Sequence, residues 1–398
     1  MVEETRKITL FVCGDVMTGR GIDQILAHPS QPQLFERHVR SALDYVALAE
    51  RRSGPIPRPV APAWIWGEAL AVLDSMRPDV RLINLETAVT ASEDAWADKG
   101  IHYRMHPANI GAVAAPQPDC CALANNHVLD WGRGGLCETL DVLHAAGILT
   151  AGAGRDLAEA TRPACIVPRA KGTPDEGGDS ANADAPPVAA PPAPATVGAR
   201  VLVFAVAVQN SGVPPEWAAT ANRPGIAWLP DLAPAGAATI LDAVAAHRRP
   251  GDVVVVSIHW GANWVYRIPS EQRAFARRLV EGGVDLVHGH SAHHPLGIEV
   301  YRERLILHGC GDFLNDYEGI AGYAEFRPEL ALMYFPVVEA NSGRLQRLTL
   351  VPTRIGRFRI NRANDEETAW LQATLNREGE PLRTRVARDG NVLRVRWH

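Results

Sequence analysis

Short apolar runs alternate along the chain with segments whose apolar residues recur every three or four positions. The runs have the length of strands and are rich in valine, isoleucine and leucine, whereas the spaced segments have the periodicity of amphipathic helices. We predict strands at Ile8–Cys13, Val80–Ile83, Asp119–Leu123, Val201–Val206, Val253–Ser257 and Val284–Val287. We predict helices at Trp66–Met76, Leu136–Ala146, Ala237–His247 and Glu271–Glu281. This alternation predicts an α/β fold in which helices are layered on sheets.

The C-terminal part of the chain has a different pattern. Apolar runs follow one another there and predict the consecutive strands of a meander or an edge sheet: Gly297–Val300, Leu305–Leu307, Leu330–Val338 and Leu345–Val351. A short helix is predicted at Asp365–Asn376, and the Asp389-Gly390 pair within the alternating segment Arg383–Trp397 predicts a hairpin. We therefore expect a main domain at 1–358 and a helix–hairpin extension at 359–398.

The segment 169–199 fits neither pattern. It consists largely of glycine, proline, alanine, aspartate and serine, and it lacks apolar periodicity. A segment of this composition cannot bury enough apolar surface to offset the entropy cost of ordering its backbone. We therefore predict a disordered surface insertion between two strands of the main domain.

Composition and charge narrow the classes of function. The chain has 398 residues, of which 46% are hydrophobic, so a large core needs neither disulfides nor a structural metal for its stability. The formal net charge is -5 and basic residues form no run, which argues against nucleic-acid binding. The 6 cysteines include no CxxC pair, and no apolar stretch reaches the roughly 18 residues of a membrane span. We expect reduced thiols, no membrane anchor and a cytoplasmic protein.

Polar side chains stand where five of the predicted strands end. They are Asp15 after the first strand, Asn84 and Glu86 after the second, Asn125, Asn126, His127 and Asp130 after the third, His259 after the fifth, and His290, His293 and His294 after the sixth. In open α/β sheets, ligands bind beyond the carboxyl ends of the strands. Carboxylate, amide and imidazole groups together suit one or two divalent ions such as Mn, Zn or Fe, with a position left open for water. The pattern therefore predicts a metal-dependent enzyme site.

Several motifs give the chain a family resemblance. GDVMTGR, INLE, ANNHVLDWGRGGLCETLDVL, HWG and VDLVHGHSAHHPLGIEVYRERLILHGCGDF occur in this order between about residue 8 and about residue 355. With this set of motifs the chain resembles the CapA family, which is associated with poly-γ-glutamate capsule synthesis and is built on the calcineurin-like metallophosphatase fold. The resemblance implies a four-layer α/β/β/α sandwich for the main domain.

The resemblance also implies roles for the polar residues. The implied metal ligands are Asp15, Glu86 as the bridging acid, Asn126, His259, His290 and His293. The implied proton donor is His127, held in place by Asp130. For Asn125 and Asp130, roles in turns and helix capping fit the sequence equally well. His294 precedes a proline, and we expect it to be structural or to support the ligands.

Three features depart from the superfamily pattern. Met17 stands where the first motif usually has a histidine. Ser291 and Ala292 make the spacing between the last two implied ligands one residue longer than usual, and Asp312 replaces a common asparagine. These departures leave three arrangements open: two metals, one metal, or no metal with an acid and histidines used for proton transfer.

Three functions are compatible with these residues. The first is a divalent-metal-dependent hydrolase that acts on a phosphoester or on a peptide or γ-glutamyl amide. The second is a metal-independent peptide epimerase in which Asp15 and a late histidine such as His293 exchange a proton with a peptide α-carbon. The third is a non-catalytic member of a polymer-synthesis complex. Arg20 and Arg104 either bind an anionic substrate group or form ion pairs, and Trp260 either walls a substrate pocket or packs beneath it.

Overall fold

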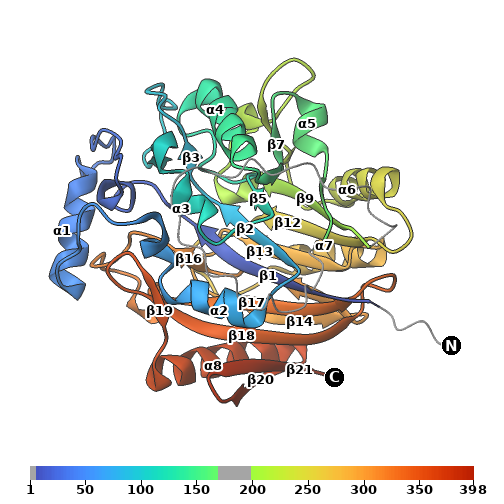
Figure 1. Ribbon diagram of the computed structural model, residues 1–398. Coiled ribbons are helices and arrows are strands. Elements are labelled where there is room, and N and C mark those ends of the chain that lie inside the picture. Colours follow the sequence, from blue (N-terminus) through green and yellow to red (C-terminus); the bar gives the residue numbers. More distant parts are fainter. Residues whose placement is uncertain (1–5, 169–198) are drawn as a thin grey trace, which may run out of the picture.

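The computed structural model describes residues 6–168 and 199–398 and contains two large β-sheets with helices packed against them (Figure 1). The first sheet has the order β20-β21-β18-β17-β1-β2-β5-β6, with β16 paired to β1 and β19 to β18. Its strands are β1 Lys7–Val16, β2 Val80–Leu85, β5 Cys120–Ala122, β6 Leu149–Ala151, β16 Asp312–Leu314, β17 Leu330–Glu339, β18 Leu345–Ile355, β19 Ile360–Arg362, β20 Thr384–Asp389 and β21 Val392–Trp397. The predicted insertion at 169–199 lies outside the described residues except for its last residue.

The second sheet has the order β11-β9-β12-β13-β15-β14, with β8 paired to β9. Its strands are β8 Ala164–Ile166, β9 Val201–Val208, β11 Trp228–Leu229, β12 Val253–His259, β13 Leu286–His290, β14 Ile298–Tyr301 and β15 Arg304–Leu307. Two short pairs join β3 Ala88–Val89 to β4 Arg104–Met105 and β7 Ala153–Gly154 to β10 Gly225–Ile226. The helices are α1 Ala42–Ser53, α2 Glu68–Met76, α3 Gly111–Ala114, α4 Gly132–Ala145, α5 Leu157–Thr161, α6 Pro234–His247, α7 Ser270–Glu281 and α8 Asp365–Gly379.

Parallel pairing at the centre of each sheet brings strand ends together. β1, β2 and β5 are parallel in the first sheet, and β9, β12 and β13 are parallel in the second. At the carboxyl ends of these strands, Asp15 lies opposite Asn84 and His259 lies opposite His290. Each sheet therefore places predicted site residues side by side.

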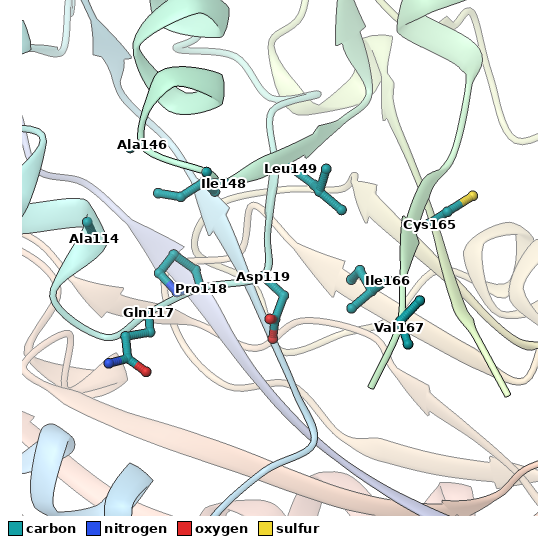
Figure 2. Close-up of a pocket in the computed structure, with 11 residues that line it drawn as sticks. Ala114, Gln117, Pro118, Asp119, Ala146, Ile148, Leu149, Cys165, Ile166 and Val167 are labelled. Carbon is teal, nitrogen blue, oxygen red and sulfur yellow. The ribbon is translucent and has the colours of Figure 1, made fainter. Parts of the chain in front are cut away.

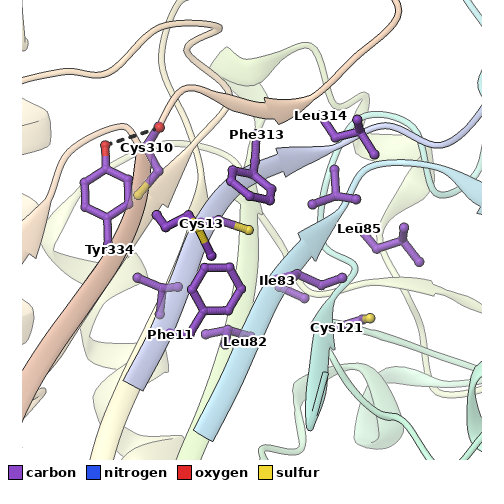
Figure 3. Packing of buried hydrophobic residues seen from close by; sticks show 14 of the residues in the cluster. Phe11, Cys13, Leu82, Ile83, Leu85, Cys121, Cys310, Phe313, Leu314 and Tyr334 are labelled. Carbon is purple, nitrogen blue, oxygen red and sulfur yellow. Dashed lines mark hydrogen bonds between the residues drawn. The ribbon is translucent and has the colours of Figure 1, made fainter. Parts of the chain in front are cut away.

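Alternation along β12 determines which side chains face the first sheet. Val255 belongs to the main apolar cluster together with Phe11 of β1, whereas Val254 packs with α6 and α7 in a second cluster. In the main cluster, part of which is drawn in Figure 3, the rings of Phe11 and Phe313 have centroids 6.1 Å apart. His259 continues the face of Val255, because side chains two positions apart on a strand share a face. The face that builds the core thus ends in the candidate site.

The predicted meander is wrong. β14 and β15 belong to the second sheet, whereas β17 and β18 belong to the first. β15 pairs with β13, and the chain then crosses to the first sheet, where β16 pairs with β1. The predicted helix Trp66–Met76 is also too long, because Gly67, at φ +45°, separates a 3-10 turn at Pro62–Trp66 from α2. Apolar runs identify strands, but they do not specify which neighbour a strand will take.

The C-terminal helix and hairpin complete one edge of the first sheet. β21 pairs with β18, and β20 forms the outermost strand. Asn364 and Glu367 form a capping box at the start of α8. Asn376 of α8 exchanges hydrogen bonds with the backbone of Val386, and Gln372 donates to the same carbonyl. The helix therefore covers an edge that would otherwise expose unpaired backbone groups.

Thiols and membrane segments can be assessed directly in this structure. All six cysteines lie in the described ranges and all are free, as the expectation of reduced thiols requires. Among the helices of the described residues, none combines the length and the apolar character needed to span a bilayer.

Candidate metal centre

Asp15 lies in the middle of the site, at the end of β1, where its side chain is fully buried. Its Oδ1 accepts a hydrogen bond from Asn84 Nδ2 at 2.7 Å, and its Oδ2 accepts one from Ser291 N at 3.2 Å. The pairing register between β1 and β2 shifts just before Asp15, which marks a bulge. Glycine is required at position 14 because a Cβ there would lie 1.5 Å from the carbonyl oxygen of Gly311.

Two sets of metal-ligand groups share Asp15. One set consists of Asp15, His259 and His290, and the other of Asp15, His293 and Asp312. Within each set the donor atoms lie within 4.8 Å of one another, and all five residues are buried. The two Nδ1 atoms of His259 and His290 are 2.8 Å apart, and His293 Nδ1 is 2.8 Å from Asp312 Oδ1. A carboxylate common to two donor sets is suited to hold two neighbouring ions.

Glu86 adds a further acid to the same buried space. Asn84 Nδ2 donates to its Oε2 at 3.3 Å, and His259 Nδ1 lies 3.9 Å from that oxygen. Burial, together with the charge of Asp312, raises the pKa of Asp15 to about 7. Burial and the charge of Asp15 raise the pKa of Glu86 well above its ordinary value. A cation bound among these acids would offset both their desolvation and their mutual repulsion.

Asn126 provides an independent indication of a missing partner. Its Oδ1 is buried and has no hydrogen-bond partner among residues 6–168 and 199–398. The neighbouring Asn125 differs, because its amide donates to Asn84 and to the Leu85 carbonyl while its Oδ1 accepts from the backbone of His127. An unpaired buried amide oxygen is costly unless it binds something. The oxygen and nitrogen donors of the site therefore fit a divalent ion such as Mn, Zn or Fe.

His127, Asp130 and Lys99 form a hydrogen-bonded group beside Glu86. His127 Nδ1 lies 2.7 Å from Asp130 Oδ2 and 3.0 Å from Lys99 Nζ, and Lys99 Nζ lies 2.5 Å from Asp130 Oδ1. Burial lowers the pKa of His127 to about 4. Burial alone would raise the pKa of Asp130, but His127 and Lys99 lower it. His127 Nε2 is 3.9 Å from Glu86 Oε1, so the ring nitrogen that is not bonded to Asp130 faces the acids of the site.

The other imidazoles divide into two kinds. Burial lowers the pKa of His259 and of His290 well below the ordinary value, which keeps both rings in the neutral, ligand-competent form. Burial alone would lower the pKa of His293, but Asp312 raises it above the ordinary value. Asn263 Nδ2 lies 3.1 Å from the other nitrogen of His293. His294 packs against Phe326, with ring centroids 4.5 Å apart, and belongs to neither donor set.

The three residues predicted to bind substrate lie away from the donor atoms or have partners of their own. The Arg20 guanidinium is buried and binds Asp316 and Glu36, so an anionic substrate would compete with two carboxylates. Arg104 donates to the Ser92 carbonyl at 2.6 Å and lies over the ring of Trp131. Trp260 is 1% exposed and packs in the second cluster, beneath α7.

Lys99 and Asp312 are site residues whose roles the sequence reasoning missed. In the sequence, Asp312 stands out only as a departure from a motif, in which it replaces a common asparagine. Lys99 gave no signal, because it lies 28 positions from His127 in a loop without periodicity. Ser257 is the last residue of a predicted strand and His288 follows the end of another; neither was predicted as a site residue, yet Ser257 Oγ lies within hydrogen-bond distance of both His288 and His290.

Hollows elsewhere on the surface differ from this site. Figure 2 shows one of about 490 Å³, lined by Asp119 and by apolar residues such as Ile148, Leu149 and Val167. It lies where β5 and β6 begin, whereas the donor sets lie where β1, β12 and β13 end. Another hollow, of about 680 Å³, borders the donor sets through Asn315, which donates to Asp312, and Tyr317, whose ring lies 5.5 Å from that of His293.

Comparison with known proteins places this chain among capsule synthesis proteins. The family described as bacterial capsule synthesis protein PGA_cap matches residues 9–173 and 181–317. A probable polyglutamine synthesis accessory protein of Mycobacterium tuberculosis is 46% identical over 392 residues, which are 98% of this chain and 96% of that protein. The capsule biosynthesis protein CapA of Bacillus anthracis is 25% identical over 318 residues, 79% of this chain and 61% of that protein. The resemblance expected from the motifs is confirmed: the chain belongs to the PGA_cap family of bacterial capsule synthesis proteins, the CapA family.

Proposed function

We propose that this protein is a divalent-metal-dependent hydrolase with a calcineurin-like metallophosphatase fold. The observation that carries the proposal is the pair of buried donor sets that share Asp15. Asp15, Glu86, Asn126, His259, His290 and His293 would hold one or two ions of Mn, Zn or Fe, and Asp312 would join them in the second set. When bound, such an ion supplies a nucleophilic water at neutral pH and polarises the bond to be cleaved.

The residues around the donor sets divide the remaining work. Asp130 and Lys99 hold His127 through its Nδ1, so that Nε2 faces the acids. Nε2 would first take up a proton, giving an imidazolium that Asp130 stabilises, and would then pass that proton to a leaving group. Asn84 fixes the carboxylate of Asp15. A substrate would approach the second donor set from the hollow lined by Asn315 and Tyr317, because these two residues contact Asp312 and His293. His127 thus handles the proton, Asn84 orients a carboxylate, and the hollow receives the substrate.

The names of the relatives suggest the substrate class. The Mycobacterium protein is named as an accessory of polyglutamine synthesis, and the Bacillus proteins are named for capsule or PGA biosynthesis. We take the substrate to be a peptide or γ-glutamyl amide, or a phosphoester formed during synthesis of such a polymer. A non-catalytic role in a polymer-synthesis complex would show itself as bound metal without turnover of either class.

Metal content tests the proposal first. Protein purified without chelator and incubated with Mn, Zn or Fe should contain near-stoichiometric metal by elemental mass spectrometry, and Asp15→Asn should contain little. Asp23→Asn is the matched control, because Asp23 is equally buried and its carboxylate accepts hydrogen bonds from His106, Asn109 and Ser30, none of which belongs to either donor set. Metal-free wild-type protein after all three incubations would overturn the proposal. Metal-loaded protein is then assayed on phosphoesters and on γ-glutamyl and peptide amides.

A specific observation favours a second candidate function. The pKa of Asp15, raised by burial to about 7, lets this carboxyl both accept and release a proton near neutral pH. Met17 also removes one nitrogen ligand that the superfamily pattern supplies. A metal-independent peptide epimerase would use Asp15 and His293 as the acid–base pair. Deuterium uptake from D2O at a peptide α-carbon, catalysed by chelator-treated protein and lost in Asp15→Asn, would identify this activity.

A further inference from the structure

A chain of hydrogen bonds runs from β1 to the proposed ligand His290. His288 Nε2 lies 2.7 Å from the carbonyl oxygen of Cys13. His288 Nδ1 lies 3.0 Å from Ser257 Oγ, and the same hydroxyl lies 2.8 Å from His290 Nε2. The side chains of all three linked residues are 0% exposed. This chain of hydrogen bonds therefore lies in the buried interface between the two sheets.

The direction of each hydrogen bond follows from its first acceptor. A carbonyl oxygen only accepts, so His288 Nε2 must carry a hydrogen. His288 is neutral, because its ring is fully buried and has only a hydroxyl and a carbonyl oxygen, and no carboxylate, as hydrogen-bond partners among the described residues. Its Nδ1 is then an acceptor and takes the hydrogen of the Ser257 hydroxyl. That hydroxyl in turn accepts the hydrogen on His290 Nε2.

The last link decides the chemistry of His290. A neutral imidazole with its hydrogen on Nε2 has a free lone pair on Nδ1. Nδ1 is the atom of His290 that lies 2.8 Å from His259 Nδ1 and 3.9 Å from Asp15 Oδ1. The opposite direction would bring the bare Nε2 of a neutral His288 within 2.7 Å of a carbonyl oxygen, with no hydrogen between them.

We infer that Ser257 and His288 are positioning residues that fix the Nε2–H tautomer of His290 and so present its Nδ1 lone pair to the metal centre. The inference rests on the proposed function, since it assigns His290 as a ligand. Histidine ligands in metal sites generally donate the other ring hydrogen to a fixed acceptor, which sets both tautomer and orientation. The same relay ties β13 to β1 two residues before Asp15, so it also aligns ligands that come from different sheets.

The tautomer can be read without any metal. In chelator-treated protein labelled with ¹⁵N-histidine, two-bond ¹H–¹⁵N correlations distinguish a ring protonated at Nε2 from one protonated at Nδ1. The signals of His290 are identified by their absence in His290→Gln. We expect His290 to carry its hydrogen on Nε2 in the wild type. A hydrogen on Nδ1 would overturn the inference, whether or not the protein binds metal.

Mn²⁺ titration calorimetry measures the consequence. Ser257→Ala should weaken Mn²⁺ binding by about 10- to 100-fold, as expected for loss of a group that orients a ligand. Ser257→Thr keeps the hydroxyl and should recover most of the affinity. Ser211→Ala is the matched control, because this buried serine also touches the site strand but donates only to the carbonyls of Val208 and His259.

The two measurements separate the inference from the proposed function. Equal Mn²⁺ affinity in wild type and Ser257→Ala would overturn the relay while leaving the metal centre intact. A wild type that binds no metal would overturn the proposed function, and the ¹⁵N spectrum would still decide which nitrogen of His290 carries the hydrogen. Parallel thermal unfolding of each variant identifies any loss of affinity that comes from misfolding.

Discussion

The buried acid Glu299 and the buried acids of the candidate site, Asp15 and Glu86, have opposite electrostatic surroundings. Glu299 accepts hydrogen bonds from Arg273 Nη2 and Arg277 Nε, both at 2.9 Å, and lies 3.0 Å from His308 Nε2. Burial alone would raise the pKa of Glu299, but these three partners lower it to about 2. Asp15 and Glu86 lie close to other acids instead: burial and the charge of Asp312 raise the pKa of Asp15, and burial and the charges of Asp15 and Asp312 raise that of Glu86.

The difference separates structural acids from acids that need an external cation. The charge of Glu299 is balanced inside the chain, so this residue ties α7 to β14 and the end of β15. The carboxylates of Asp15 and Glu86 instead accept hydrogen bonds from neutral amide groups, those of Asn84 and the Ser291 backbone. Asp130 lies at the site but belongs with Glu299, because it is paired with Lys99 and hydrogen-bonded to His127. We therefore expect a substitution at His127 to impair proton transfer without loss of metal.

The largest expected effect is a loss of kcat without loss of metal, on substitution of His127. His127→Gln should lower kcat by about 100- to 10,000-fold on whichever substrate the wild type turns over, since a general acid contributes on that scale. Its metal content should stay at the wild-type level, because His127 belongs to the internally balanced group. Elemental mass spectrometry and steady-state kinetics on the same preparation measure both. Loss of metal together with activity would contradict the division.

A smaller effect is expected at the balanced acid. Glu299→Gln should destabilise the protein at pH 7 by about 3 kcal/mol in urea unfolding, because it leaves Arg273 and Arg277 without their anion. The pKa of Glu299 falls from its ordinary 4.5 to about 2 on folding, so its contribution is complete above about pH 4.5 and is lost as the pH falls toward 2. The difference from the wild type should therefore shrink between pH 5 and pH 2.5.

Glu281→Gln is the control for that measurement. Its side chain is 42% exposed and pairs with Arg302 at the surface, so its removal should change stability by less than about 1 kcal/mol at either pH. A pH-independent loss of stability in Glu299→Gln would instead indicate a packing defect.

The smallest expected effect is a gain in the free energy of unfolding, on substitution of Asp15. Asp15→Asn should stabilise the metal-free protein by about 1–2 kcal/mol, because it removes a repelling charge that function retains at a cost in stability. Saturating Mn²⁺ should reverse the order, since only the wild type then gains binding free energy. Urea unfolding with and without Mn²⁺ measures both differences. A metal-free Asp15→Asn that is less stable than the wild type would show that the acids are satisfied within the chain.

The sequence predicted the parts of the molecule that depend on local pattern. Short apolar runs located β1, β12 and β13, and polar residues at their ends located Asp15, His259 and His290. The family assignment followed from motifs in the same places, because a motif is a local pattern as well. Sheet membership was out of reach: β14 and β17 look alike as apolar runs and belong to different sheets.

The features that the sequence did not predict depend on partners distant in sequence. The sequence left open whether Arg20 binds an anion or forms an ion pair, because its partner Asp316 is 296 positions away. The relay from His290 to Cys13 depends on how the two sheets pack, which no spacing in the sequence encodes. Trp260 follows a site residue directly, but alternation turns it to the opposite face of the sheet.

The central position of β1 affects the order in which the sheet can form during synthesis. β1 is near the N-terminus, whereas two of its partners, β16 and β17, begin at Asp312 and Leu330. During synthesis the strand that carries Asp15 leaves the ribosome long before they exist, and Ser291, which bonds its carboxylate, follows 276 residues later. A nascent chain of this protein must keep an apolar strand from aggregating through most of its translation. The proposed metal centre could therefore be completed only after the segment that carries Ser291 and Asp312 has been made.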